Sequence, residues 1–129
     1  MRIIYNKHFP FGAFFAMNLF GVIFVRSDKG QMSEVVKNHE YIHTLQQREM
    51  LFVGFMLWYV AEWLYRFTTK IILERKALRI GQLRRSLGRM WIDAYSDIYF
   101  EREAYTNERD LDYANHRRPF AWWHMMKKK

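Results

Sequence analysis

Cysteine is absent from this chain of 129 residues. Disulfides and thiolate metal ligands are therefore excluded, so any metal site has to use histidine and carboxylate side chains. The lack of cysteine is compatible with a reducing cytoplasm, which is where we expect the protein. Proline and glycine are also scarce, with two and six residues respectively. This scarcity favours a helix-rich protein.

Long apolar runs and targeting signals are lacking as well. The first eight residues have neither the continuous apolar core nor the small-residue cleavage site of a signal peptide. The longest apolar run extends from Leu51 to Ala61 and is interrupted by Glu62, whereas a helix that crosses a bilayer requires roughly 20 apolar residues. We therefore expect residues 51–67 to form a helix that is packed inside the protein. A membrane span or a re-entrant segment is the alternative.

Acidic side chains are fewer than basic ones, and the formal net charge is +8. The basic residues concentrate in residues 75–89 and in the C-terminal lysines 127–129. Such clusters beside aromatic residues bind nucleic acid or an anionic membrane surface, or simply form a solvated helix face. No recognisable nucleic-acid-binding module is present, so we expect no specific nucleic-acid partner. Peripheral, reversible contact with an anionic membrane is the interaction that this charge favours.

Half of the residues are apolar and 19% are aromatic, a composition that excludes disorder and predicts one domain covering residues 1–129. Aromatic and β-branched residues at 17–26 predict one or two strands, with a hairpin around Asn18 or Gly21. The predicted helices cover residues 33–49, 51–67, 70–85, 99–108 and 120–126. The first helix can end near Gly54 or continue into the second. The expected fold class is α+β and predominantly helical, with an N-terminal β-hairpin or short strands before a helical core.

The most informative motif is an H-E-x-x-H sequence at residues 39–43, within the first predicted helix. His39 and His43 are four residues apart and therefore lie on one helix face, where both imidazoles can bind one metal ion. Glu40 can reach a water in the open coordination position of that metal and take its proton. Ser33 is a suitable N-cap for this helix. A chance match, or two solvent-exposed histidines, would give the same pattern without a metal.

A hydrolytic metal site of this kind needs a third protein ligand. Without cysteine the candidates are carboxylates and the remaining histidines, which are His8, His116 and His124. The metzincin continuation H-x-x-G-x-x-H does not follow the first pair, which excludes that class. A glutamate from a later helix is the alternative, and Glu101 occurs in an E-x-x-A sequence. Ala104 shares the helix face of Glu101 and would let a facing helix approach closely.

With H-E-x-x-H followed by E-x-x-A, the chain resembles the gluzincins, in particular compact minimal gluzincin domains and the membrane-linked peptidases that pair these motifs. The resemblance covers residues 38–47 and 100–108. It implies a zincin-like helical core and a zinc peptidase in which Glu40 is the general base. The zinc ligands that it implies are His39, His43 and Glu101. Tyr105 stands where those families place an aspartate, a carboxylate that orients a ligand histidine.

Several assignments stay open at this point. Glu62 competes as third ligand if the chain turns near Gly54, and Glu103 is a further candidate. The candidates for stabilising an oxyanion are Tyr105, Tyr113 and His116. In peptidases of this class a β edge beside the motif helix binds an extended peptide. Residues 20–25 are candidates for that edge, or for a hairpin that only covers the helices.

The expected function is that of a zinc-dependent metallohydrolase, a metallopeptidase that acts on a peptide or protein substrate. The alternative is a non-catalytic protein that retains a zinc site for stability, or a protein that interacts with a membrane surface. So short a chain has little material for a deep substrate cleft, which favours this alternative.

Overall fold

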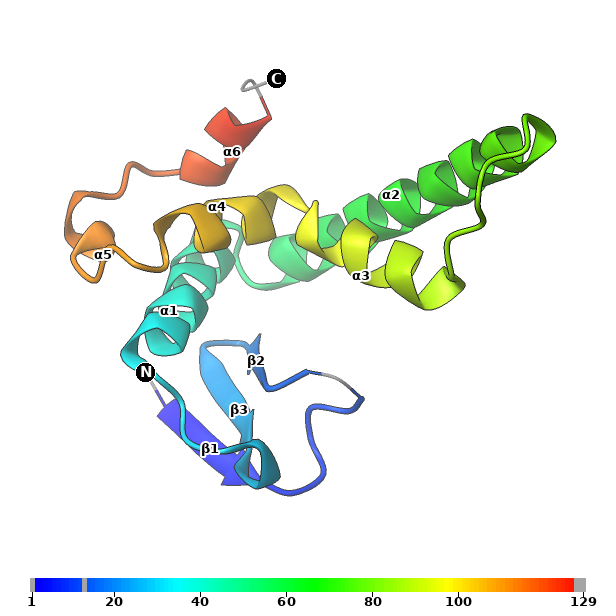
Figure 1. The fold of residues 1–129 in the computed structure, drawn as a ribbon. Helices are drawn as coiled ribbons and strands as arrows, with labels where there is room; N and C mark the ends of the chain where they lie inside the picture. Colours follow the sequence, from blue (N-terminus) through cyan, green and yellow to red (C-terminus); the bar gives the residue numbers. More distant parts are fainter. Residues whose placement is uncertain (1, 13, 127–129) are drawn as a thin grey trace.

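The computed structural model describes residues 2–12 and 14–126. A small sheet is followed by helices, which confirms the α+β, predominantly helical fold class (Figure 1). The strands are β1 (Arg2–Asn6), β2 (Ala16–Leu19) and β3 (Val22–Arg26), with a 3-10 turn η1 (Ser27–Lys29) after them. The α-helices are α1 (Glu34–Glu49), α2 (Val53–Arg79), α3 (Leu87–Ser96), α4 (Tyr99–Asn107), α5 (Tyr113–His116) and α6 (Ala121–Met125). The sheet, α1, α4 and α6 follow one another in space, since α1 contacts both β2 and α4, and α4 contacts α6.

Strand β3 lies at the centre of the sheet, parallel to β1 and antiparallel to β2. The hairpin between β2 and β3 turns at Phe20 and Gly21, so of the two expected turn positions the one at Gly21 is correct. Residues 20–25 belong mostly to β3, which pairs on both sides, so of the two alternatives for this segment the peptide-binding edge is wrong. The outer strand on the hairpin side of the sheet is β2. Strand β1 is not evident from the sequence, because it pairs Arg2 with the distant Val22.

Helix α1 has the predicted N-cap. The side chain of Ser33 accepts a hydrogen bond from the N–H of Val36 at 3.3 Å, which satisfies one of the free donors of the first turn. After α1 the chain turns at Leu51 and Phe52, whose φ angles of 51° and 57° are uncommon for residues other than glycine. The N–H of Phe52 closes this turn on the carbonyl of Gln47 at 2.6 Å. The first two helices are therefore separate, and the break precedes the glycine that was expected to mark it.

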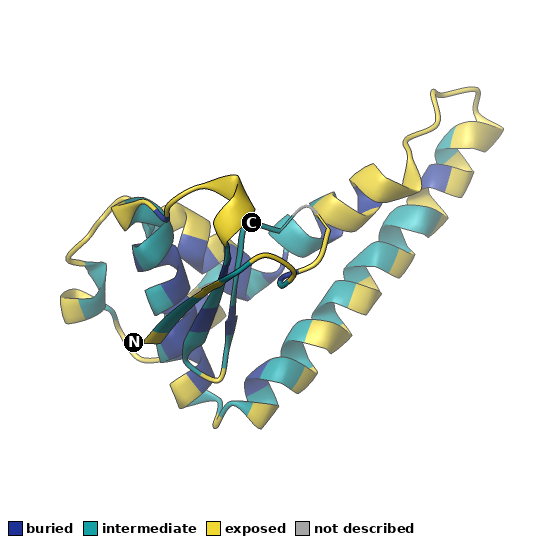
Figure 2. Cartoon of the chain, turned by 90° about the horizontal axis from the view of Figure 1, so that it is seen from below, coloured by how far each residue is buried: buried dark blue, intermediate teal, exposed yellow. Residues whose placement is uncertain are grey.

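Helix α2 packs only one of its faces against the rest of the protein (Figure 2). On that face Phe55 is buried in a cluster with Phe100 and Trp122. The apolar side chains exposed on its outward face include Val53, Leu57, Leu64 and Tyr65. The expectation that residues 51–67 lie inside the protein is therefore wrong for this outward face. Within the described residues, no helix combines the length and apolar character needed to cross a membrane.

Helix α2 is longer than expected, and the prediction of a separate helix at residues 70–85 is wrong. After Gly54 in its first turn, the helix meets no breaking residue until Gly81, which has a φ of 79° and follows the end of the helix. Glu74 fixes the loop that follows by accepting hydrogen bonds from the backbone N–H and the side chain of Arg85. Helix α3, which the sequence analysis did not predict, then starts at Ser86, whose hydroxyl caps the helix.

Candidate metal centre

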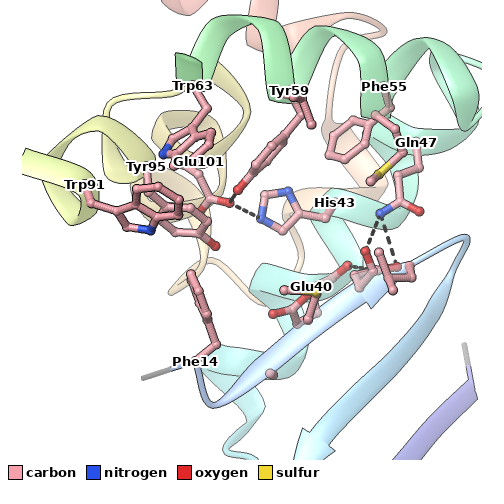
Figure 3. A pocket seen from close by; sticks show the side chains of 16 residues that line it. Phe14, Glu40, His43, Gln47, Phe55, Tyr59, Trp63, Trp91, Tyr95 and Glu101 are labelled. Carbon is pink, nitrogen blue, oxygen red and sulfur yellow. Dashed lines mark hydrogen bonds and ion pairs between the residues drawn. The ribbon is translucent and has the colours of Figure 1, made fainter. Parts of the chain in front are cut away.

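Two histidines of α1 and one glutamate of α4 converge in the interior of the protein. The Nε2 atoms of His39 and His43 lie 3.1 Å apart. The carboxylate of Glu101 lies across them, with Oε1 3.2 Å from His43 Nε2 and Oε2 3.4 Å from His39 Nε2. Figure 3 shows His43 and Glu101 pointing toward each other. The three side chains are buried, and each offers an atom within 4.8 Å of the others, a spacing that one metal ion can bridge.

Hydrogen bonds fix the orientation of both imidazole rings. His39 Nδ1 lies 2.9 Å from Oε2 of Glu108, and His43 Nδ1 lies 2.7 Å from Oε1 of Gln46. The amide group of Gln46 donates to the carbonyl of Phe100 at 3.0 Å, which leaves its oxygen free to accept from His43. When neutral, each ring would therefore carry its proton on Nδ1 and present the lone pair of Nε2 to the centre. This is the tautomer that metal-ligating histidines use.

Glu108 is a residue of the centre that sequence reasoning missed. It follows α4 and supplies to His39 the carboxylate that the resemblance placed three residues earlier, at the position of Tyr105. The amide of Asn38 holds the segment after α4 in place by donating to the carbonyls of Glu108 and Asp110, at 2.9 and 2.8 Å. The sequence held two signals for this contact. Asn38 directly precedes the motif, and Glu108 is an acidic residue about one helical turn after the position of the expected aspartate.

Two carboxylate oxygens at the centre have no hydrogen-bond partner among the described residues. They are Oε2 of Glu40 and Oε2 of Glu101, and both are buried. The other oxygen of Glu101 accepts a hydrogen bond from the hydroxyl of Tyr59 at 2.7 Å. Buried carboxylate oxygens without donors are unfavourable, and a cation bound beside them would compensate them. The donor set of two imidazole nitrogens and a carboxylate fits zinc.

The charges of the centre act strongly on one another. Burial alone would lower the pKa of His43, but the charge of Glu101 and hydrogen bonds to Glu101 and Gln46 raise it to about 9. Burial alone would raise the pKa of Glu101, yet the charges of the nearby His43 and His39 hold it well below its usual range. Burial raises the pKa of Glu40 above that of an ordinary glutamate. A cation that binds to these histidines must therefore displace a proton.

These shifts predict opposite pH dependences for the metal-free and the metal-bound protein. The raised pKa of His43 means that its imidazolium stabilises the folded state below pH 6.5, and that this contribution is lost as the pH rises to about 9. The free energy of unfolding of chelator-treated protein should fall by up to about 3 kcal/mol over this window. With excess zinc it should rise instead, because the metal binds the unprotonated nitrogen.

Urea denaturation at several pH values, with chelator or with zinc, measures both trends. The variant His43→Gln serves as control, since it lacks the titrating group and should show neither trend. A metal-free protein of constant stability between these pH values would contradict the pairing of His43 with Glu101.

Two cavities adjoin the centre. The smaller, of about 260 Å³, is lined by Glu40, His43 and Glu101 together with β2 and several aromatic side chains (Figure 3). These aromatic residues are Phe14, Phe55, Tyr59, Trp63, Trp91 and Tyr95. The larger cavity, of about 600 Å³, is lined by His39, Glu40 and again Tyr95. Glu40 therefore stands in the wall of both cavities, beside the centre.

The competing ligand candidates are engaged elsewhere. Glu62 accepts hydrogen bonds from the side chains of Trp58 and Arg66, and Glu103 from Gln46 and Arg117. His8, His116 and His124 lie outside the centre: His8 and His124 are exposed, and His116 bonds to Asp110. Within the described part of the chain, His39, His43 and Glu101 are the one group with the spacing of a metal site.

The structure also distinguishes among the three candidates for oxyanion stabilisation. The ring of Tyr105 packs against His39, with ring centroids 4.6 Å apart. Tyr113 instead donates to Glu103 at 3.2 Å, and His116 is exposed. Tyr95 of α3, which the sequence did not single out, lines both cavities. Of the three candidates Tyr105 is therefore the one beside the centre, where Tyr95 also lines the cavities and Tyr59 already donates its hydroxyl to Glu101.

Comparison with known proteins does not assign the chain to a family. No protein-family model, no curated protein and no solved structure matches the chain.

Proposed function

We propose that the protein is a zinc-dependent metallohydrolase, and that it cleaves peptide bonds. His39, His43 and Glu101 would hold the ion, and Glu40 would be the general base. The observation that carries this proposal is the convergence of the Nε2 atoms of His39 and His43 on the buried carboxylate of Glu101. Beside them Glu40 lines a cavity, and its Oε2 has no hydrogen-bond partner among the described residues. A structural zinc site is typically closed by four protein ligands, whereas three ligands beside a cavity are typical of catalytic sites.

Zinc bound there would lower the pKa of a water in its open position and polarise the carbonyl of the substrate. Glu40 would accept a proton from that water and would later donate it to the leaving amine. Its raised pKa suits both steps, because burial makes the carboxylate a stronger base than an exposed glutamate. Glu108 and Gln46 keep the histidines in the tautomer that the ion requires.

The cavity indicates the kind of substrate that we expect. Residues 16–19, which form the edge strand β2, line the smaller cavity next to Glu40. An extended peptide can add to such an edge through its backbone, with alternate side chains directed toward the cavity. The aromatic lining around Phe55 and Trp91 would accommodate an apolar side chain of that peptide.

The decisive test is the substitution Glu40→Gln. It should leave about one zinc per chain bound and reduce hydrolysis of apolar peptides by about 10²–10⁴-fold, the usual contribution of a general base. Elemental analysis gives the zinc content, and mass spectrometry of a peptide library gives the cleavage rate. The exposed Glu34 lies on the same helix, so Glu34→Gln is the matched control and should change neither quantity.

If the unsubstituted protein binds zinc but cleaves no peptide, the metal site is structural and the proposal of catalysis fails. If purified protein that is reconstituted with zinc retains none, the metal site itself is refuted.

A further inference from the structure

The segment that we call the arm, residues 70–92, projects from the body of the molecule (Figure 2). It contains the last turns of α2, a loop and the first part of α3. Seven basic side chains and a single acidic one lie in the arm. The acidic residue, Glu74, is buried and bonded to Arg85, so it offers little negative charge to a partner. Most of the net charge of +8 is therefore concentrated at one end of the molecule.

Large apolar side chains are exposed between these basic ones. Leu83 is 96% exposed and Ile80 is 74% exposed, at the end of the arm. The other exposed aliphatic residues of the arm are Ile72, Leu73, Leu78, Leu87 and Ile92. Lys70 and Arg85 form ion pairs, while no described residue pairs with Arg75, Lys76, Arg79 or Arg84. An exposed cluster of this kind marks an interaction surface.

We propose that the arm docks on the surface of a bilayer that contains anionic phospholipid. Basic side chains interleaved with leucine and isoleucine suit the membrane interface, where the aliphatic groups enter the headgroup region and the charges meet lipid phosphates. The arm is a projection rather than a groove, which a bilayer accepts without a complementary shape. Nucleic acid would neutralise the charge but leave Leu83 and Ile80 in water. Since no described helix can cross a membrane, the contact is peripheral.

Sedimentation of the full chain with vesicles tests this docking. Vesicles of phosphatidylcholine with phosphatidylglycerol should bind the protein, while vesicles of phosphatidylcholine alone should bind it far more weakly. Each basic residue at the surface contributes about fivefold, so a variant with glutamine at positions 75, 76, 79 and 84 should bind at least roughly a hundredfold more weakly. The double variant Ile80→Ser and Leu83→Ser should lose roughly tenfold through the lost apolar contact.

A charge-matched control distinguishes the effect of the basic residues in the arm from the effect of the total net charge. Glutamine at the exposed positions Arg2, Lys7, Arg109 and Arg118 removes the same charge elsewhere and should reduce binding much less. Circular dichroism confirms that each variant is folded. Equal loss in both quadruple variants would overturn the proposal, as would absence of binding to anionic vesicles.

Two further outcomes would also overturn it. One is sedimentation of the free protein as a dimer that dissociates in the Ile80→Ser, Leu83→Ser variant, which would make a second copy the occupant. The other is preferential binding to duplex DNA over vesicles. The docking does not rest on the hydrolase proposal, so Glu40→Gln should bind vesicles like the unsubstituted protein.

Discussion

Replacing Glu101 with glutamine should reduce zinc affinity by several orders of magnitude and leave the purified protein nearly free of metal. The carboxylate of Glu101 is the group that faces both His39 and His43, so its loss removes one ligand and the negative charge that offsets the ion. The amide keeps the shape of the side chain and can still meet the hydroxyl of Tyr59. Competition with a fluorescent chelator measures the affinity.

A graded series sharpens this result. Glu108→Gln removes only the carboxylate that orients His39, and losses of about 10–100-fold are typical of such partners. Glu62→Gln changes a glutamate that lies outside the centre and should leave zinc affinity unchanged. Full metal content in Glu101→Gln, together with metal loss in Glu62→Gln, would show that the third ligand is assigned to the wrong residue.

The substitution Arg117→Ala should destabilise the protein more than other changes outside the core. The guanidinium of Arg117 is buried and bridges two carboxylates, with hydrogen bonds of 3.1 Å to both Glu49 and Glu103. Its removal leaves the buried carboxylate of Glu103 and the partly buried one of Glu49 without a countercharge, and loss of a buried ion-pair partner costs about 3–5 kcal/mol. For a chain of this size such a loss lowers the melting temperature by roughly 10 °C or more.

Thermal and urea denaturation measure this loss, and the neighbouring Arg118→Ala is the control. Arg118 is exposed, so its removal should change the free energy of unfolding by less than about 0.5 kcal/mol. Equal stability of the two variants would contradict the proposed role of the bridge. Because Glu103 also accepts a hydrogen bond from Gln46, which orients His43, the Arg117→Ala variant should bind zinc more weakly as well.

Some local features of the fold were readable from the sequence, although helix α3 and the full length of α2 were not, and most long-range features were not. Helix α1 and its cap at Ser33 depend on neighbours within four residues, and the same spacing places His39 and His43 on one face. Helices α4 and α6 also fall within their predicted ranges. Strand β1 depends on pairing with β3, about twenty positions away, and its short run gives no local signal.

The same distinction applies to the centre. Glu101 could be proposed from its motif, whereas choosing it over Glu62 required the contacts of Glu62 with Trp58 and Arg66, because the turn at Leu51 and Phe52 is the kind that would have allowed Glu62 to be a ligand. The contact of Glu108 with His39 could not be predicted, because the position of Glu108 depends on how Asn38 holds the segment after α4. Local sequence patterns therefore predict which chemical groups are available, and tertiary packing determines which of them lie close together.

Strand β2 also has a consequence for self-association. Its four residues, Ala16–Leu19, carry no charge, and a neutral, partly apolar edge is the kind that recruits strands from other molecules and seeds aggregates. Two features oppose this. The strand is very short, and the amide of Asn18 is turned inward, where it donates to the carbonyl of Glu40 at 2.6 Å and to the hydroxyl of Thr44 at 2.7 Å. An edge set into a cavity would admit a single flexible chain more readily than the rigid sheet of another folded copy.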